Sequence, residues 1–130
     1  MTAVDTNILV RIITRDNAEQ AERAVAFLER EESVFLAKTV LLEFEWVLRG
    51  IYKYGRSEVL SALGVVLSID NAEIEDAVAV TQAIDWYAQG MDFADSLHLA
   101  SAPRPHRFAS FDAALRRRTM RIGTADVVCP

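Results

Sequence analysis

Short apolar runs alternate along the chain with longer segments in which apolar residues recur every three or four positions. A short apolar run bounded by turn residues predicts a strand, and a three-to-four spacing predicts a helix with one buried face. Strands are expected at Ala3–Asp5, 33–37, 72–74, 107–110 and 125–128. Helices are expected at Ile8–Ile13, 18–31, 39–54, 57–67, 75–89, 92–101 and 112–118.

Capping and turn residues punctuate this pattern. Thr6-Asn7 and Thr39 are expected to start helices, and Gly55 is expected to end the helix that Thr39 begins. Strands that alternate with helices predict the α/β class. We therefore expect one domain over residues 1–130, a three-layer α/β/α sandwich around a mostly parallel central sheet.

Composition supports one soluble domain. The chain has 130 residues, 52% of them hydrophobic, which is enough for a core without disulfides. The single cysteine, Cys129, excludes a disulfide framework or a cysteine zinc site within one chain. No apolar stretch approaches a membrane span, and residues 1–5 lack a signal-peptide pattern. A cytoplasmic location without membrane contact is the resulting expectation.

The net charge of −5 disfavours a nucleic-acid partner, but the charges are unevenly distributed along the chain. Residues 101–130 carry six basic and two acidic side chains, whereas residues 1–100 are strongly acidic. Such a basic end could bind a phosphate backbone, and the alternative is an ordinary solvated helix. The candidate phosphate contacts are Arg104, Arg107, Arg116 and Arg117.

Four acids occur where ligands bind in α/β proteins. Asp5 ends the first predicted strand and Asp112 follows the strand at 107–110, so both fall at carboxyl ends of strands. Glu43 and Asp95 lie near the starts of predicted helices. Clustered carboxylates repel one another unless a cation binds between them, and Mg²⁺ or Mn²⁺ prefers such oxygen ligands. A metal held in this way can activate water against a phosphodiester.

Each candidate also has a purely structural interpretation. Asp5, Asp92 and Asp112 could simply cap the helices that follow them. Glu43 could do no more than favour the positive end of its helix. Thr6 and Ser110 adjoin candidate ligands, so they could bond either to a metal shell or to local backbone.

Four segments, in order, resemble the motifs of PIN-domain nucleases: Val4–Leu9, Leu42–Leu48, Met91–Ala100 and Phe108–Asp112. The third has the form common among VapC-like toxins of bacterial toxin–antitoxin pairs. The resemblance implies a Mg²⁺- or Mn²⁺-dependent endoribonuclease that acts as the toxin of such a pair, is neutralised by a cognate antitoxin and commonly forms a homodimer.

The resemblance also implies the roles of individual acids. Asp5 and Asp95 match the usual primary metal ligands, and Glu43 and Asp112 complete the catalytic site. Asp92 matches a frequent acid whose role is less fixed. Thr6 and Ser110 remain secondary candidates beside the ligands.

Two other functions require residues that the chain lacks, and a third shares the fold without catalysis. A phospho-accepting receiver needs a lysine near its last strand, but the only lysines are Lys38 and Lys53. A haloacid-type phosphatase needs a second acid two places after Asp5, where Asn7 stands. A non-catalytic protein-binding module that keeps the same fold is the remaining alternative.

Overall fold

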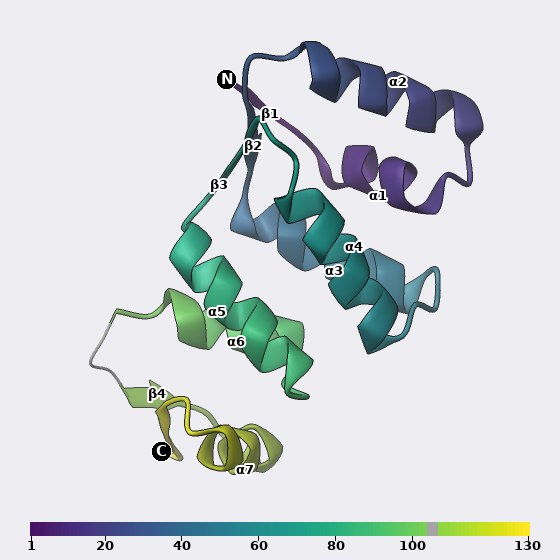
Figure 1. Ribbon diagram of the computed structural model, residues 1–130. Coiled ribbons are helices and arrows are strands. Elements are labelled where there is room, and N and C mark those ends of the chain that lie inside the picture. The colour runs from purple at the N-terminus through teal and green to yellow at the C-terminus, as the bar shows by residue number, and fades with distance from the viewer. Residues whose placement is uncertain (104–106) are drawn as a thin grey trace. The chain divides into compact units, whose positions relative to one another are not determined.

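The structure, a computed structural model, describes residues 1–103 and 107–130. They form two compact units, Met1–Glu75 and Asp76–Pro130, which we call unit 1 and unit 2. Figure 1 shows both units, with helices α1–α7 and strands β1–β4 labelled.

Unit 1 contains a three-stranded parallel sheet and four helices. Its elements in chain order are β1 (Thr2–Ala3), α1 (Thr6–Thr14), α2 (Ala18–Arg30), β2 (Val34–Leu36), α3 (Lys38–Gly50), α4 (Arg56–Leu67) and β3 (Ala72–Ile74). The strand order is β1-β2-β3, with Thr2 opposite Val34 and Val34 opposite Ala72. Parallel neighbours need long crossover connections, and paired helices provide them here: α1 and α2, then α3 and α4.

The core of unit 1 explains why these helices form. Phe44 and Leu48 are fully buried on α3, as are Leu9 on α1 and Leu63 on α4. The apolar residues that recur every three or four positions in these helices are thus the residues that are buried.

Unit 2 contains three helices and two parallel strands. Its elements are α5 (Ala77–Ala88), α6 (Phe93–Ser101), β4 (Arg107–Ala109), α7 (Ala113–Ile122) and β5 (Asp126–Val128). Arg107 pairs with Asp126 at the start of the β4–β5 ladder. The rings of Tyr87 and Phe93 meet edge to face, with centroids 5.4 Å apart, where α5 packs on α6. A second cluster of buried side chains comprises Trp86, Met91, Leu99, Leu115 and Val127.

The predicted α/β class is confirmed, and every strand pair of the described residues is parallel. All five predicted strands occur within two residues of their expected bounds. They belong to two sheets, one in each unit. Among the described residues, no helix has both the length and the apolarity to span a membrane.

The boundaries of α3 were predicted wrongly at both ends. The helix stops at Gly50 instead of 54, and Gly55 lies at the start of α4, where its N–H donates to Glu58 Oε1 at 3.0 Å. Thr39 does not cap α3, because the N-cap is Ala37, which makes no side-chain cap bond.

Candidate active site

Asp5 is positioned by both elements that flank it. It lies two residues beyond β1 and is the N-cap of α1, where its Oδ1 accepts a hydrogen bond from the Thr6 N–H at 2.8 Å. The helix was expected over Ile8–Ile13 with Thr6-Asn7 as its cap, but it begins two residues earlier, at Thr6, because the carboxylate of Asp5 takes the capping position. Asp5 is exposed, so the cap leaves it accessible to solvent.

Thr6 carries the unusual polar atom of this segment. Its side chain is buried, and its Oγ1 has no hydrogen-bond partner among the described residues. A buried hydroxyl without a partner costs about 1–3 kcal/mol. An oxygen of this kind beside Asp5 is chemically suited to a ligand or water that would bind there.

Glu43 lies on α3, which follows β2, the strand that pairs with β1. It is exposed. Because parallel strands end at one edge, the segments that carry Asp5 and Glu43 both leave the sheet at that edge.

Glu75 is an acid of this edge that sequence reasoning missed. It directly follows β3, and its Oε1 accepts a hydrogen bond at 2.8 Å from the N–H of Lys38, the first residue of α3. Its place after a predicted strand was the available signal.

Asp92 and Asp95 lie together at the start of α6 in unit 2. Asp92 is the N-cap, and its Oδ2 accepts a hydrogen bond from the Asp95 N–H at 3.1 Å. The buried Ser96 hydroxyl donates to the Asp92 carbonyl at 2.8 Å. The capping interpretation of Asp92 is thus observed.

Asp112 caps α7 in the same manner. Its Oδ1 accepts from the Ala114 and Leu115 N–H groups at 2.9 and 3.1 Å. Ser110 Oγ in turn accepts from the Asp112 N–H at 3.0 Å. The Ser110 hydroxyl therefore takes part in ordering the backbone ahead of α7.

The charges of unit 2 converge on Asp95. Partial burial raises the pKa of Asp95 above its usual range, and the neighbouring charges of Asp92 and Asp112 raise it further. His98 and Arg118 act in the opposite direction but do not cancel these effects. Three of the candidate acids thus share one electrostatic environment, which disfavours the ionised form of Asp95 when no cation is present.

The four predicted catalytic acids divide evenly between the units: Asp5 and Glu43 in unit 1, Asp95 and Asp112 in unit 2. Within either unit, no three His, Cys, Asp or Glu side chains of residues 1–103 and 107–130 form a metal-binding group. The chemistry of the donors nevertheless fits a hard divalent cation, since every candidate offers oxygen. In unit 1 the unpartnered Thr6 hydroxyl is a further oxygen of this kind.

Most of the predicted phosphate contacts are exposed. Arg107 is on β4, and Arg116 and Arg117 are on α7. Arg104 lies outside the described residues. Helix α7 runs to Ile122, beyond its predicted end, before Gly123 adopts the left-handed conformation at φ 77°.

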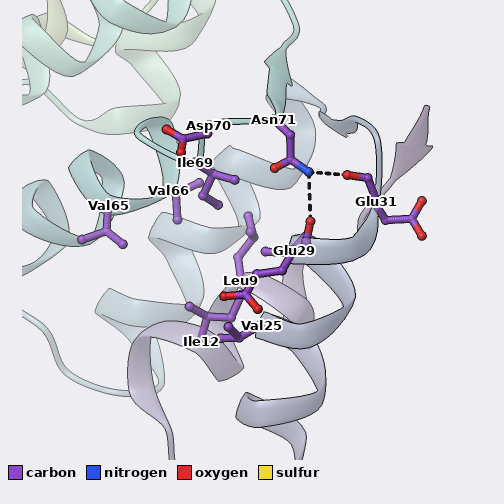
Figure 2. A pocket seen from close by; sticks show the side chains of 11 residues that line it. Leu9, Ile12, Val25, Glu29, Glu31, Val65, Val66, Ile69, Asp70 and Asn71 are labelled. Carbon is purple, nitrogen blue, oxygen red and sulfur yellow. Dashed lines mark hydrogen bonds between the residues drawn. The ribbon is translucent and has the colours of Figure 1, made fainter.

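Unit 1 also contains a hollow of about 480 Å³ that no predicted site residue lines. We call it the acid-rimmed hollow, because its walls are mainly apolar side chains and its edge carries Glu29, Glu31 and Asp70 (Figure 2). Asn71 fixes one side of it, since its Nδ2 donates to the carbonyls of Leu28 and Glu31 at 2.9 and 2.8 Å.

The family model described as "PIN domain" matches residues 2–119, which include all four predicted catalytic acids. Comparison with the curated proteins and with the solved structures gives no significant match.

Proposed function

The chain belongs to the PIN domain family, and on this premise we propose that it is an endoribonuclease that hydrolyses RNA phosphodiester bonds with Mg²⁺ or Mn²⁺. PIN domains are generally metal-dependent nucleases. The observation that supports the proposal is the electrostatic environment of Asp95, whose pKa is raised by partial burial and then by the charges of Asp92 and Asp112. A bound cation would offset the unfavourable ionisation of a carboxylate in such an environment.

Asp5 and Asp95 would hold the metal, and Glu43 and Asp112 would complete the site. A bound divalent ion supplies a more acidic water and neutralises charge on the phosphate. Glu43 and Asp112 would orient the attacking water through their carboxylate oxygens. Thr6 would contribute its unpartnered hydroxyl to the same shell.

The arginines of unit 2 would bind the phosphate backbone of the RNA. Arg107, Arg116 and Arg117 are exposed, and such side chains give contacts that position a nucleic acid without selecting a sequence. Arg104 is proposed to join them. An acidic protein can thus present a local basic surface to an anionic substrate.

We further propose that the enzyme is a homodimeric, cytoplasmic toxin that a cognate antitoxin neutralises. The acid-rimmed hollow would bind an amphipathic antitoxin segment, with apolar side chains against its walls and basic side chains paired with Glu29, Glu31 and Asp70. Apolar contacts would supply affinity, and the opposite charges would select the partner.

The nuclease proposal is tested with purified protein and end-labelled RNA. We expect cleavage with Mg²⁺ or Mn²⁺ and none with EDTA, and we expect Asp5→Asn and Asp95→Asn each to abolish it. The matched control is Asp70→Asn, which removes an exposed acid away from the predicted site. Full activity in either site variant would refute the assignment, and a wild-type protein that binds a partner but never cleaves would indicate the non-catalytic module.

The toxin proposal needs a separate experiment. Expression of the chain should arrest growth, and co-expression of a small DNA-binding protein encoded next to it should restore growth. Val65 lines the acid-rimmed hollow and is 51% exposed, so Val65→Asp should spare the fold and the cleavage but prevent rescue. Undiminished rescue of this variant would place the antitoxin elsewhere.

A further inference from the structure

A second hollow of unit 1, of about 420 Å³, lies along helices α1 and α2. We call it the arginine hollow, because it is lined by three arginines and by no aspartate or glutamate. Its polar and aromatic side chains are Asn7, Arg11, Gln20, Arg23, Phe27 and Arg30. The chain is acidic overall, so a hollow whose charged lining residues are all cations is a distinct feature of this unit.

The periodicity of α2 produces this surface. Gln20, Arg23, Phe27 and Arg30 follow one another at steps of three and four residues, so they share one face of the helix. Glu29 lines the acid-rimmed hollow instead. Helix α2 therefore presents opposite charges to the two hollows.

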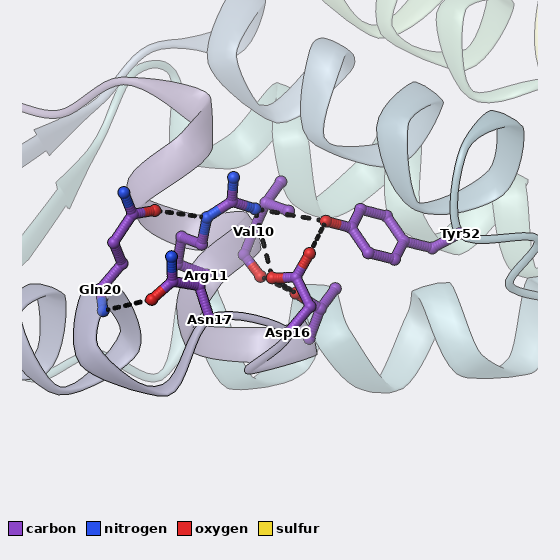
Figure 3. Close-up of polar contacts among 7 residues, drawn as sticks. Val10, Arg11, Asp16, Asn17, Gln20 and Tyr52 are labelled. Carbon is purple, nitrogen blue, oxygen red and sulfur yellow. Dashed lines mark hydrogen bonds and ion pairs between the residues drawn. The ribbon is translucent and has the colours of Figure 1, made fainter.

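Arg11 is held in place at the α1 side of the arginine hollow. Its Nε donates to Gln20 Oε1 at 2.7 Å, and its Nη1 donates to Asp16 Oδ1 and Tyr52 Oη at 3.3 and 3.2 Å (Figure 3). Tyr52 donates to Asp16 Oδ2 at 2.6 Å. This network orders Arg11, and the Arg11 guanidinium forms an ion pair with the Asp16 carboxylate.

Arg23 and Arg30 are available to a ligand. Both are exposed, and neither makes an ion pair with a carboxylate among the described residues. The Arg30 guanidinium lies 5.3 Å from the centroid of the half-buried Phe27 ring. A hollow that holds two guanidinium groups and an aromatic ring combines the two contacts that single-stranded nucleic acid uses: phosphate pairing and base stacking.

We propose that the arginine hollow is a subsite for single-stranded RNA, in which Arg23 and Arg30 bind phosphates and Phe27 stacks on a base. The inference rests on the proposed nuclease function and adds an RNA contact in unit 1 to those of unit 2. Asn7 lies between the hollow and the proposed metal ligand Asp5 along the chain, since it lines the hollow and stands two residues after Asp5. RNA bound there extends to the end of α1 that carries the proposed metal ligand. An acidic peptide would also pair with arginine, but it would leave the ring and the amides of Asn7 and Gln20 without a use.

The test measures binding of a fluorescently labelled single-stranded RNA oligonucleotide by anisotropy, in EDTA so that no cleavage occurs. The double variant Arg23→Gln/Arg30→Gln should weaken binding. It should also reduce the magnitude of the negative slope of log K against log salt by about 1.4, the value for two lost phosphate contacts. Phe27→Leu keeps an apolar side chain but removes the ring, and should weaken binding about fivefold or more. The control Arg56→Gln removes one exposed charge from α4, outside the hollow, and should change the Kd less than twofold.

Thermal melting checks that each variant folds, and RNA cleavage in Mg²⁺ is measured in parallel. Wild-type cleavage together with equal RNA binding by all variants would overturn the subsite and leave the nuclease proposal intact. Cleavage without RNA binding in EDTA would do the same. A wild-type protein that neither binds nor cleaves RNA would overturn both. Polyglutamate that displaces RNA, and itself binds with the same dependence on Arg23 and Arg30 but none on Phe27, would assign the hollow to an acidic polypeptide instead.

Discussion

The carboxylate of Asp92 accepts a hydrogen bond from the backbone N–H of Asp95 at 3.1 Å. One residue therefore has two effects on the other. The bond fixes the backbone of Asp95 in the first turn of α6, and the charge of Asp92 raises the pKa of Asp95. Capping and electrostatics can be separated here, because asparagine caps a helix as well as aspartate does but carries no charge.

Asp92→Asn should preserve both the fold and RNA cleavage, since the amide oxygen still accepts the bond from Asp95. Asp92→Ala should lower the free energy of unfolding by about 1 kcal/mol, the usual cost of a lost N-cap. Urea unfolding and initial cleavage rates measure the two effects. If Asp92→Asn is as inactive as Asp95→Asn, then Asp92 is a metal ligand as well as a cap.

The same pair of substitutions at Asp112 should affect stability as at Asp92, but both should abolish RNA cleavage. Asp112→Asn keeps the bonds to the Ala114 and Leu115 N–H groups, so the stability should stay within about 0.5 kcal/mol of wild type while cleavage is lost. Asp112→Ala should lose cleavage and also about 1 kcal/mol of stability. Normal cleavage by Asp112→Asn would reduce Asp112 to a helix cap.

The raised pKa of Asp95 predicts how stability depends on pH without metal. The folded state binds the Asp95 proton more tightly than the unfolded state, so this group contributes a loss of stability as the pH rises from the usual aspartate pKa through the raised one. Asp95→Asn lacks this loss, and the metal-free variant should melt at a higher temperature than wild type near pH 7 but not near about pH 3.

Metal completes that comparison. Mg²⁺ should raise the melting temperature of the wild type and leave Asp95→Asn unchanged, since ligand binding stabilises only a protein that can bind it. Equal metal-induced shifts in both proteins would exclude Asp95 as a ligand. Asp85→Asn, an exposed change on α5, is the control.

Thr6→Val tests the unpartnered hydroxyl. The substitution removes a buried polar atom at nearly constant volume, so the metal-free protein should gain about 1 kcal/mol of stability. Metal affinity, followed by calorimetry, should fall, whereas Thr6→Ser should retain it. Unchanged affinity in Thr6→Val would show that the hydroxyl serves no ligand.

Much of the fold could be predicted from local sequence. The apolar runs before turns located all five strands, and Asp5 and Asp112 were recognised by their positions after strands, whereas Glu75 after β3 was not. The end of α3 could not be predicted, because apolar residues continue at helical spacing to Ile51 while the backbone turns, with Lys53 at φ 60°. The bond from Lys38 to Glu75 was also out of reach, because it joins residues 37 positions apart.

The candidate site was predictable as a set of residue types but not as a network. Capping was foreseen for Asp92 and Asp112, and their joint effect on Asp95 required three-dimensional placement. The catalytic and metal-binding roles of Asp5, Glu43, Asp95 and Asp112 stay predictions. The arginine hollow was missed, because Arg23 and Arg30 alternate with glutamates and look like an ordinary solvated helix until α1 is placed beside them.

The small side chains of Ala21 and Ala24 occupy buried positions on α2. Ala24 lines the arginine hollow, and α2 packs directly on α1. A larger residue at either position would wedge the two helices apart and alter the shape of both hollows at once. Alanine here therefore acts as a spacer that sets how closely α1 and α2 approach one another.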